Sequence, residues 1–220
     1  MQFTTISDTH GLHHQLKLPG GVLLIHAGDV CNRGTQQEAA NFIDWFEKQP
    51  YAYKVFIAGN HDFFFEHFTQ QEIQKILPKN IFYLNDSGIE IEGIKLWGSP
   101  ITPEFHNWAF NRKRGKEIEE HWKQIPFQTD ILITHGPAFG ILDTTFNNQN
   151  VGCIDLLTHI ERVNPKYHIF GHIHESFGTL QNHNTTFINT SLLDFNYRMR
   201  ETPFFHFNFY NFSKFLLIFD

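Results

Sequence analysis

Cysteine is scarce in this sequence of 220 residues, and the two that occur, Cys31 and Cys153, lie far apart. Their spacing fits neither a disulfide framework nor the paired cysteines of a structural zinc site. The segment from Met1 to Ser7 also lacks the basic stretch, apolar core and small-residue cleavage site of a secretory leader. We therefore expect a protein without structural disulfides, located in the reducing cytoplasm.

Long apolar runs are missing as well, and charged residues make up only 18% of the chain. No segment approaches the length that crosses a bilayer, so we expect no membrane partner. The net charge of -6 argues against a dedicated nucleic-acid surface, because such surfaces gather positive charge along the phosphate backbone. A small phosphate ligand stays compatible, because a bound metal ion can reverse the local field.

Two residue types are abundant instead: the chain has 25 phenylalanines and 15 histidines. We expect most phenylalanines in the core. Histidine is the more informative of the two, because neutral imidazole is a frequent metal ligand and titrates near neutral pH. The positions of the histidines therefore guide the search for a site.

Short β-branched or aromatic segments alternate with amphipathic ones, which is the pattern of a layered α/β fold. Main strands are expected at residues 1–6, 22–25, 54–58, 131–134 and 167–170, and shorter ones at 81–84, 89–91 and 95–97. Helices are expected at residues 36–49, 69–77, 111–124 and 152–163. The length and the lack of a linker predict a single domain over residues 1–220.

Each main strand runs directly into a polar fragment. In chain order these fragments are Ser7-Asp8-Thr9-His10, His26-Ala27-Gly28-Asp29, Gly59-Asn60-His61-Asp62, His135-Gly136-Pro137 and Gly171-His172-Ile173-His174. Open α/β sheets bind ligands beyond the carboxyl ends of their strands, so we expect these side chains to converge. The glycines at 28, 59, 136 and 171 would allow sharp turns that bring the side chains close together.

Each fragment alone has an ordinary explanation. Asp8 and His10 suit a turn residue and a surface imidazole, and residues 59–62 suit a polar turn after a strand. Five such fragments in this order, each at a strand end, are hard to produce by chance. The combination therefore predicts one site.

Aspartate, histidine and asparagine in one site suit a pair of divalent metal ions. Two ions about 3.5–4 Å apart need a bridging anion, and we assign Asp29 to this role because a carboxylate has two oxygens. The other ligands are mostly neutral, so the pair keeps positive charge and lowers the pKa of a bound water toward neutrality. Imidazole-rich coordination favours Mn, Fe, Zn, Co or Ni over Mg or Ca.

This ordered set of fragments resembles the calcineurin-like metallophosphoesterase superfamily over most of the chain. The segments at residues 26–34, 134–137 and 172–175 look like those of the small metallophosphoesterase-domain proteins that hydrolyse phosphodiesters, including cyclic nucleotides. The resemblance implies a two-sheet β-sandwich flanked by helices, in four layers ordered α-β-β-α.

The resemblance also implies the ligands of the two ions. One ion is expected at Asp8, His10, Asp29 and His174, and the second at Asp29, Asn60, His135 and His172. His61 is expected near the substrate rather than on a metal, where it stabilises the phosphoryl charge or protonates the leaving oxygen, with Asp62 orienting its imidazole. No Ser or Cys nucleophile with a neighbouring base occurs in these fragments, so we expect direct attack by a metal-bridging hydroxide.

Several other residues have two interpretations. Phe63, Phe64 and Phe65 suit core packing or a wall that stacks on a nucleobase. Arg33 suits a phosphate contact or a structural ion pair. The basic cluster Arg112-Lys113-Arg114 with Lys116 suits the solvated face of a helix. Other histidines, namely His13, His14, His106, His121 and His206, are expected at the surface or in the core, and His26 stays unassigned.

The C-terminal region is rich in phenylalanine. Phe205, Phe207 and Phe209 alternate and predict a strand, and residues 215–219 predict a final one. Such an aromatic surface also suits burial against a second subunit, that is, a homodimer.

Three functional classes remain. The favoured one is a metal-dependent phosphodiesterase acting on a small phosphate-ester substrate such as a cyclic nucleotide, because the short chain leaves little room for a domain that binds macromolecules. The second is a phosphomonoesterase, including a protein phosphatase, or a nuclease. The third is a non-catalytic scaffold, in which replaced ligand positions would be expected, whereas here all are filled. Substrate specificity is expected in loops such as residues 138–151.

Overall fold

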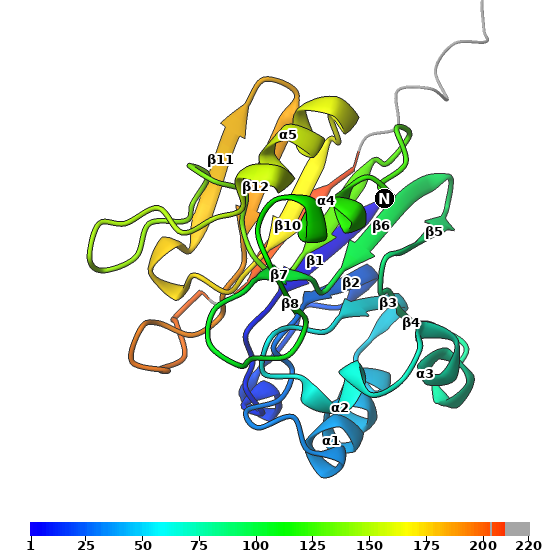
Figure 1. The fold of residues 1–220 in the computed structure, drawn as a ribbon. Coiled ribbons are helices and arrows are strands. Elements are labelled where there is room, and N and C mark those ends of the chain that lie inside the picture. The colour runs from blue at the N-terminus through cyan, green and yellow to red at the C-terminus, as the bar shows by residue number, and fades with distance from the viewer. Residues whose placement is uncertain (203, 210–220) are drawn as a thin grey trace, which may run out of the picture.

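The first of two mixed sheets contains the N-terminal strands and one strand from near the C-terminus. The computed structural model describes residues 1–202 and 204–209 (Figure 1). The order in this sheet is β13 (Phe205–Asn208), β1 (Gln2–Ile6), β2 (Gly21–Ala27), β3 (Tyr51–Ile57) and β4 (Ile81–Tyr83). The strands β1 to β4 are parallel, and β13 runs antiparallel beside β1.

The second sheet has six strands, four of them parallel. Its order is β11 (Gly178–Asn182), β12 (Thr185–Asn189), β10 (Tyr167–Phe170), β9 (Ile131–Thr134), β6 (Ile94–Ser99) and β5 (Ser87–Ile91). The edge strands β5 and β11 are antiparallel to their neighbours. A separate two-stranded ladder joins β7 (Thr102–Pro103) to β8 (Asn111–Arg112).

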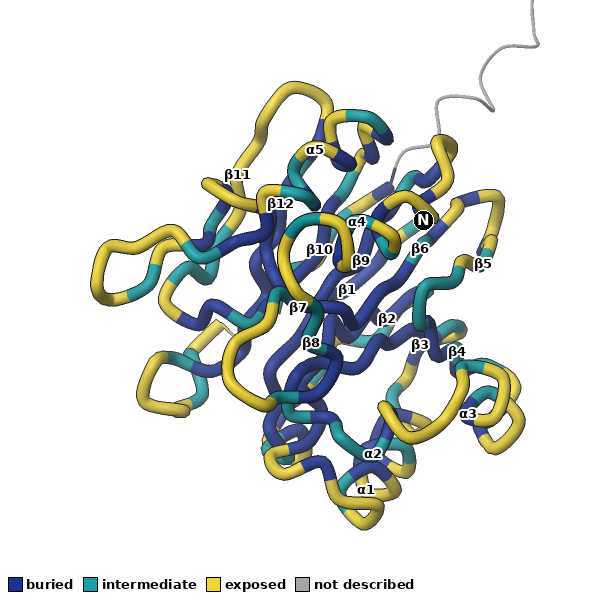
Figure 2. Tube along the Cα trace, viewed as in Figure 1, coloured by how far each residue is buried: buried dark blue, intermediate teal, exposed yellow. Residues whose placement is uncertain are grey.

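Alternation along the strands shows that the two sheets pack face to face. Residues at every second position, such as Leu23, Val55 and Ile133, belong to one buried cluster between the sheets. Their neighbours Leu24, Phe56 and Leu132 belong to a second cluster on the outer faces. Because successive strand side chains point to opposite faces, each sheet is apolar on both sides, which requires a cover on the outside. In Figure 2 the inner strands, such as β2, β9 and β10, form a buried centre, whereas the edge strands β5 and β11 are partly exposed.

Helices provide that cover, as the resemblance implied. The first sheet is covered by α1 (Gln36–Glu47), α2 (Phe63–Glu66) and α3 (Gln70–Ile76), which lie together at the bottom of Figure 1. The second is covered by α4 (Lys116–Trp122) and α5 (Ile154–Val163), which contact each other. Phe42 of α1 packs edge-on against Phe56 of β3 with 5.3 Å between ring centroids. The expected two-sheet sandwich flanked by helices is therefore confirmed.

One predicted helix is wrong at its start. Residues 111–124 were expected to be helical, but α4 spans only Lys116–Trp122, and Asn111 and Arg112 pair with Thr102 and Pro103 instead. Gly115, which precedes the helix, has φ +80°, a conformation that an α-helix does not contain. The basic cluster therefore lies mostly on a strand and a turn. Arg112 donates to the ring of His121, and Arg114 donates to backbone carbonyls of a neighbouring loop.

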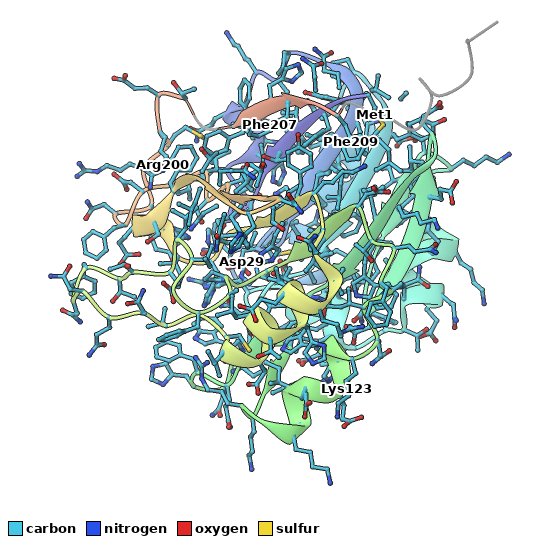
Figure 3. All side chains as sticks on the ribbon, turned by 90° about the horizontal axis from the view of Figure 1, so that it is seen from above. Met1, Asp29, Lys123, Arg200, Phe207 and Phe209 are labelled. Atoms are coloured by element: carbon cyan, nitrogen blue, oxygen red, sulfur yellow. The ribbon has the colours of Figure 1, made fainter. Side chains whose placement is uncertain are left out.

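The alternating phenylalanines of β13 face the inside of the sandwich. Phe207 stacks on Phe3 with 5.5 Å between centroids, and Phe209 is 2% exposed. Figure 3 shows Phe207 and Phe209 near Met1, whose N-terminal amine donates to the carbonyl of Phe209. The predicted strand at Phe205–Phe209 is confirmed to Asn208, and its aromatic face packs against the cluster between the sheets. The strand predicted at residues 215–219 lies outside the described residues.

Within the described ranges, every helix is too short or too polar to cross a bilayer.

Candidate metal centre

The five polar fragments meet at one end of the sandwich. The parallel strands β1, β2 and β3 of one sheet and β9 and β10 of the other end there, and backbone hydrogen bonds join their loops. Asp8 N–H donates to the carbonyl of Gly28 at 2.9 Å, and Gly171 N–H donates to that of His135 at 2.9 Å. Asp29 is buried and lies near the middle of the view in Figure 3. The predicted site residues therefore share one location.

One group of side chains consists of Asp8, His10 and His174. Their potential ligand atoms all lie within 4.8 Å of one another, and the three residues are buried. His174 Nε2 is 3.5 Å from Asp8 Oδ1. The two oxygens of Asp8 also accept from the backbone N–H of His172, at 3.1 Å each, and from the hydroxyl of Ser7. These contacts fix the carboxylate toward the two imidazoles.

A second group consists of Asp29, His135 and His172, again with ligand atoms within 4.8 Å of one another. His135 Nε2 lies 3.4 Å from Asp29 Oδ2 and 2.9 Å from Asn60 Oδ1. Asn60 is therefore part of this group. The structure thus brings together all seven residues predicted as metal ligands.

Asp29 connects the two groups. Its Oδ2 is 3.8 Å from His10 Nε2 on one side and 3.4 Å from His135 Nε2 on the other. Its second oxygen, Oδ1, accepts from the backbone N–H of His61 at 2.8 Å. This position between two sets of donors is the one that a bridging carboxylate requires.

The outer ring nitrogens of two histidines are held by backbone carbonyls. His135 Nδ1 lies 3.0 Å from the oxygen of Ala27, and His174 Nδ1 lies 3.1 Å from that of Asp194. A hydrogen bond to a carbonyl places the proton on Nδ1, which leaves Nε2 as the lone-pair nitrogen that faces the centre. This is the usual outer support of a metal-binding imidazole.

The backbone at the site adopts conformations that L-residues rarely use. Asp8, His10, Asp29 and His172 all have positive φ, between 42° and 70°. Such conformations cost of order 1–3 kcal/mol each and persist where surrounding structure or function requires them. Four of the seven predicted ligands have this backbone conformation. The loops therefore adopt unfavourable conformations at the positions whose side chains converge.

The glycines at the strand ends differ in how much space is available for a side chain. A Cβ at Gly59 would lie 2.3 Å from Asp29 Oδ1, and one at Gly171 would lie 2.0 Å from Ser7 Oγ. Close approach therefore excludes any side chain at these two positions. A Cβ at Gly136 would meet only ordinary contacts, the nearest at 3.6 Å from Thr102, so the expected need for glycine is wrong there.

Electrostatics keep both aspartates ionised. Burial opposes the charge of Asp8 and of Asp29, but hydrogen bonds and charges of His174 and His135 hold the pKa of each carboxyl well below its usual range. Burial lowers the pKa of His10 and of His172 to about 4, so these imidazoles are neutral at pH 7. Anionic carboxylates and neutral imidazoles are the protonation states in which these groups bind metals.

His135 differs from the other histidines. Burial opposes its charged form, but the carboxylate of Asp29 and the hydrogen bond to it outweigh burial and raise the pKa to about 9. Without a metal the imidazole is therefore protonated on both ring nitrogens at pH 7, and a cation that binds here takes the place of the proton on Nε2.

The donor set fits divalent transition ions. Both ring nitrogens of His10 are buried without a hydrogen-bond partner within the described part of the chain. An unsatisfied buried polar group costs about 1–3 kcal/mol, and a cation between His10 and the carboxylates would satisfy it. The ligand types, two carboxylates, one amide oxygen and four imidazoles, suit such ions better than Mg or Ca.

His61 lies at the edge of this centre. Its potential ligand atom lies within 4.8 Å of those of His10 and Asp29. Its Nδ1 is 2.8 Å from the carbonyl oxygen of Asn32, and its ring stacks on Trp108 with 4.3 Å between centroids. Both contacts fix the ring so that Nε2 is free for chemistry.

The expected contact of Asp62 with His61 is wrong. The carboxylate of Asp62 accepts instead from the backbone N–H groups of Cys31 at 2.8 Å, Gly59 at 2.8 Å and Val30 at 3.1 Å. It is buried and anchors the loops after β2 and β3, while Asn32 and Trp108 orient the imidazole. Burial and the nearby charge of Asp29 raise the pKa of Asp62 to about 7, although the three N–H donors act in the opposite direction.

A pocket of about 330 Å³ opens over the centre. Aromatic rings that the sequence motifs did not indicate form its rim: Phe105, Trp108, Phe195 and Tyr197. Tyr197 packs against His10 at 4.9 Å and against His174 at 5.2 Å between centroids. These residues belong to loops without a repeating pattern, so only their exposed aromatic character could have indicated them.

The remaining candidates lie outside this pocket. Phe65 is fully buried against Phe56 and Tyr83, so core packing is the correct interpretation for it, and Phe63 and Phe64 pack on the same cluster. Arg33 is exposed and does not line the pocket. His26 is buried behind the site, with Nε2 3.0 Å from the hydroxyl of Thr9.

Comparison with known proteins agrees with this geometry. Residues 1–176 match the family described as calcineurin-like phosphoesterase. Metallophosphoesterase domain-containing protein 1 of Homo sapiens is 37% identical over 225 residues, which cover 92% of this chain and 69% of that protein. A UPF0046 protein of Caenorhabditis elegans is 40% identical over 203 residues, which cover 87% of this chain and 69% of the relative.

Solved structures share the architecture at low sequence identity. The protein TT1561 of Thermus thermophilus has a TM-score of 0.58 at 12% identity, covering 86% of this chain and 88% of its own. GAP50 of Plasmodium, described as the anchor in the inner membrane complex, has a TM-score of 0.54 at 11% identity, covering 94% and 77%. These two likenesses show the fold, and the sequence matches show the family. The chain therefore belongs to the calcineurin-like phosphoesterase family and is a metal-dependent hydrolase.

Proposed function

We propose that the protein hydrolyses a small phosphodiester, such as a cyclic nucleotide, with two divalent ions at the centre. The observation that carries this proposal is the position of Asp29 Oδ2, 3.8 Å from His10 and 3.4 Å from His135. One carboxylate between two donor groups supports two adjacent cations that share it. When bound, such a pair supplies Lewis acidity to the phosphoryl oxygens and lowers the pKa of a water.

The charge of the pocket supports a diester over a monoester. Within the described residues, the lining of the pocket above the centre contains no lysine or arginine, and it contains Glu175. A phosphomonoester is largely a dianion at pH 7, and proteins commonly bind it with an additional arginine or lysine. A diester carries one negative charge, which the cations alone can balance. The rings of Phe105, Trp108 and Phe195 on the rim also suit the uncharged substituents of a diester.

His61 is the proposed proton donor to the leaving oxygen. With Nδ1 held by the carbonyl of Asn32, Nε2 is the nitrogen available to the substrate. His61 is half-buried, and the stacked ring of Trp108 limits its rotation. A general acid at this position typically contributes 10²–10⁴-fold in rate.

The choice among metals follows from the ligands. Four imidazoles at the centre support Mn, Fe, Zn, Co or Ni. Metal analysis of the purified protein should give two ions per chain. A sample that binds no more than one ion under metal excess would contradict the dinuclear proposal.

A substrate panel tests the reaction itself. Protein loaded separately with each metal is assayed against a cyclic nucleotide, bis(p-nitrophenyl) phosphate, p-nitrophenyl phosphate and single-stranded DNA. We expect activity with the small diesters that Asp29→Ala abolishes together with metal binding. Activity confined to the monoester would overturn the diester proposal, and activity confined to DNA would assign a nuclease.

The compartment is a further expectation. We propose the cytoplasm, since Cys31 and Cys153 are both buried and free, so the fold needs no oxidising compartment. Imaging of the tagged protein in cells tests this, and an exclusively secreted protein would contradict it.

A further inference from the structure

A second pocket, of about 560 Å³, lies beside the metal pocket. The two pockets share Phe105, His172 and Glu175 in their walls. Sites for small molecules usually measure ~300–1,000 Å³, so the second pocket can hold a substantial part of a substrate. Because the two pockets share these walls, a group esterified to a phosphate at the metal centre lies next to this pocket.

Two loops form most of the pocket, and each contributes a phenylalanine. Phe105 comes from the loop between β7 and β8, and Phe146 from the loop between β9 and α5. Phe105 is 62% exposed and Phe146 is 67% exposed. Exposed apolar surface gathered from separate loops around a cavity is typical of a ligand-binding surface. The flat faces of these rings suit a flat ligand.

Two of the three charged side chains that line the pocket have partners on the protein, and the third, Glu104, is an exposed carboxylate whose negative charge disfavours a phosphate. The guanidinium of Arg114 donates to the carbonyls of Val151 and Gly152, at 2.8 Å each. Glu175 Oε1 accepts from the backbone N–H of Phe146 at 3.1 Å. Both side chains thus hold the loop of residues 145–152 in place, and this arrangement favours an uncharged ligand over a further phosphate.

Amides provide hydrogen-bonding groups on the same loop. Asn147 and Gln149 are exposed and line the pocket. The amide of Asn150 is engaged with Asp143 and Thr144 and therefore has a structural role. An asparagine or glutamine amide presents a donor and an acceptor side by side, which matches the edge of adenine. The ligand that suits the pocket is an uncharged flat ring with such an edge.

We propose that this pocket binds the base of a nucleoside whose phosphodiester lies at the metal centre, with Phe105 and Phe146 stacking on the ring and Asn147 and Gln149 bonding its edge. The inference rests on the proposed phosphodiesterase activity, and it adds where the substrate's base lies and which residues select it. Stacking is tolerant of the kind of base, whereas the amides discriminate between bases.

A pair of substrates that differ only in the base tests the pocket. Adenosine 3′,5′-cyclic phosphate is compared with the abasic ribose 3′,5′-cyclic phosphate in the metal-loaded protein. Stacking and edge contacts should give the nucleotide a KM roughly 5- to 150-fold lower. In Phe146→Ala the KM for the nucleotide should rise about tenfold while the KM for the abasic ester and the metal content stay unchanged.

The matched control is Phe139→Ala. Phe139 is also an exposed phenylalanine between β9 and α5, at 42% exposure, but it does not line the pocket. We expect wild-type values for this variant. Equal KM values for the two substrates in the wild-type protein, or equal effects of the two substitutions, would overturn the proposal.

If neither cyclic phosphate is hydrolysed, the proposed function is contradicted. A direct binding measurement then tests whether the pocket binds a nucleobase. Equilibrium dialysis then measures the affinity of the metal-loaded protein for adenosine, which carries no phosphate. Binding that Phe146→Ala weakens at least tenfold and Phe139→Ala leaves unchanged supports the base site. No binding to the wild-type protein, or binding that Phe146→Ala leaves intact, overturns it.

Discussion

Replacing Gly59 by alanine should disable the metal centre, whereas replacing Gly136 by alanine should not. Both glycines follow a strand that ends at the site. A Cβ at Gly59 would lie 2.3 Å from Asp29 Oδ1, 2.5 Å from Asp29 N and 2.6 Å from a ring carbon of His135. All three contacts are far shorter than van der Waals distances. Because Asp29 and His135 are both buried, each must be displaced from the new Cβ at position 59. Inserting one carbon into a packed interior costs about 1–3 kcal/mol. For a chain of this length that corresponds to a Tm lower by about 2–12 °C.

The matched substitution is Gly136→Ala. There the nearest atoms are Thr102 Cγ2 at 3.6 Å and His172 Cδ2 at 3.9 Å, which are normal contacts. Replacing a glycine by alanine lowers the conformational entropy of the unfolded chain, which stabilises the folded state by about 0.4–1 kcal/mol. The Tm should therefore stay the same or rise slightly. Thermal unfolding in excess chelator measures the packing cost alone, and mass spectrometry measures metal per chain. If Gly59→Ala kept both its Tm and its metal, the close approach of these loops would not be what forms the site.

Further substitutions and pH separate the roles of individual residues. Affinity for the ion that His135 holds should rise about tenfold per pH unit from pH 6 to pH 8, because the pKa of His135 is about 9 and this ion must displace its proton; a calorimetric titration without proton release would contradict this. His61→Ala should lose 10²–10⁴-fold in kcat and retain both ions, and undiminished turnover would remove His61 as the proton donor. Trp108→Ala should lower kcat less and change the pH profile, since it loosens the His61 ring without removing it. Asp62→Asn should lower metal content as well as activity, because an amide cannot accept the three N–H bonds of these loops; full metal content by mass spectrometry would contradict that anchoring role.

The position of the site could be predicted because strand ends are marked in the sequence. The polar fragments follow β1, β2, β3, β9 and β10 directly, and parallel strands bring their carboxyl ends to one edge. The location of the site was thus predicted from the strand ends, whereas the ligands of each ion came from the resemblance to the family. The alternating strands and helices indicated a layered α/β fold, and the two-sheet sandwich followed from the resemblance.

Other parts depend on long-range contacts that no local pattern records. The strands β11 and β12 were not expected. Residues 179–182 are exposed and mostly polar, with Leu180 as the apolar exception, and they form a strand by pairing with Thr185–Thr186 and their neighbours in β12. The residues that follow Asn111 and Arg112 favour a helix, but these two residues form a short parallel strand pair with Thr102 and Pro103. Asp62 was expected to contact His61, its neighbour in sequence, and instead binds the loop after β2, some thirty residues earlier. Proximity along the chain is a poor guide to the partner of a buried carboxylate.

The pairing of β13 with β1 has a consequence for protein synthesis. β1 and the ligands Asp8, His10 and Asp29 leave the ribosome first, whereas His174 and the carbonyl of Asp194 that holds it come more than 140 residues later. The edge of β1 is covered only when Phe205–Asn208 arrive. A nascent chain that ends before residue 135 therefore carries two carboxylates and an imidazole without the other imidazoles of the ligand set, and the centre can assemble only after His174 and Asp194 have been synthesised. Binding of metal by the complete ligand set therefore has to wait until these later segments have folded onto the first ones.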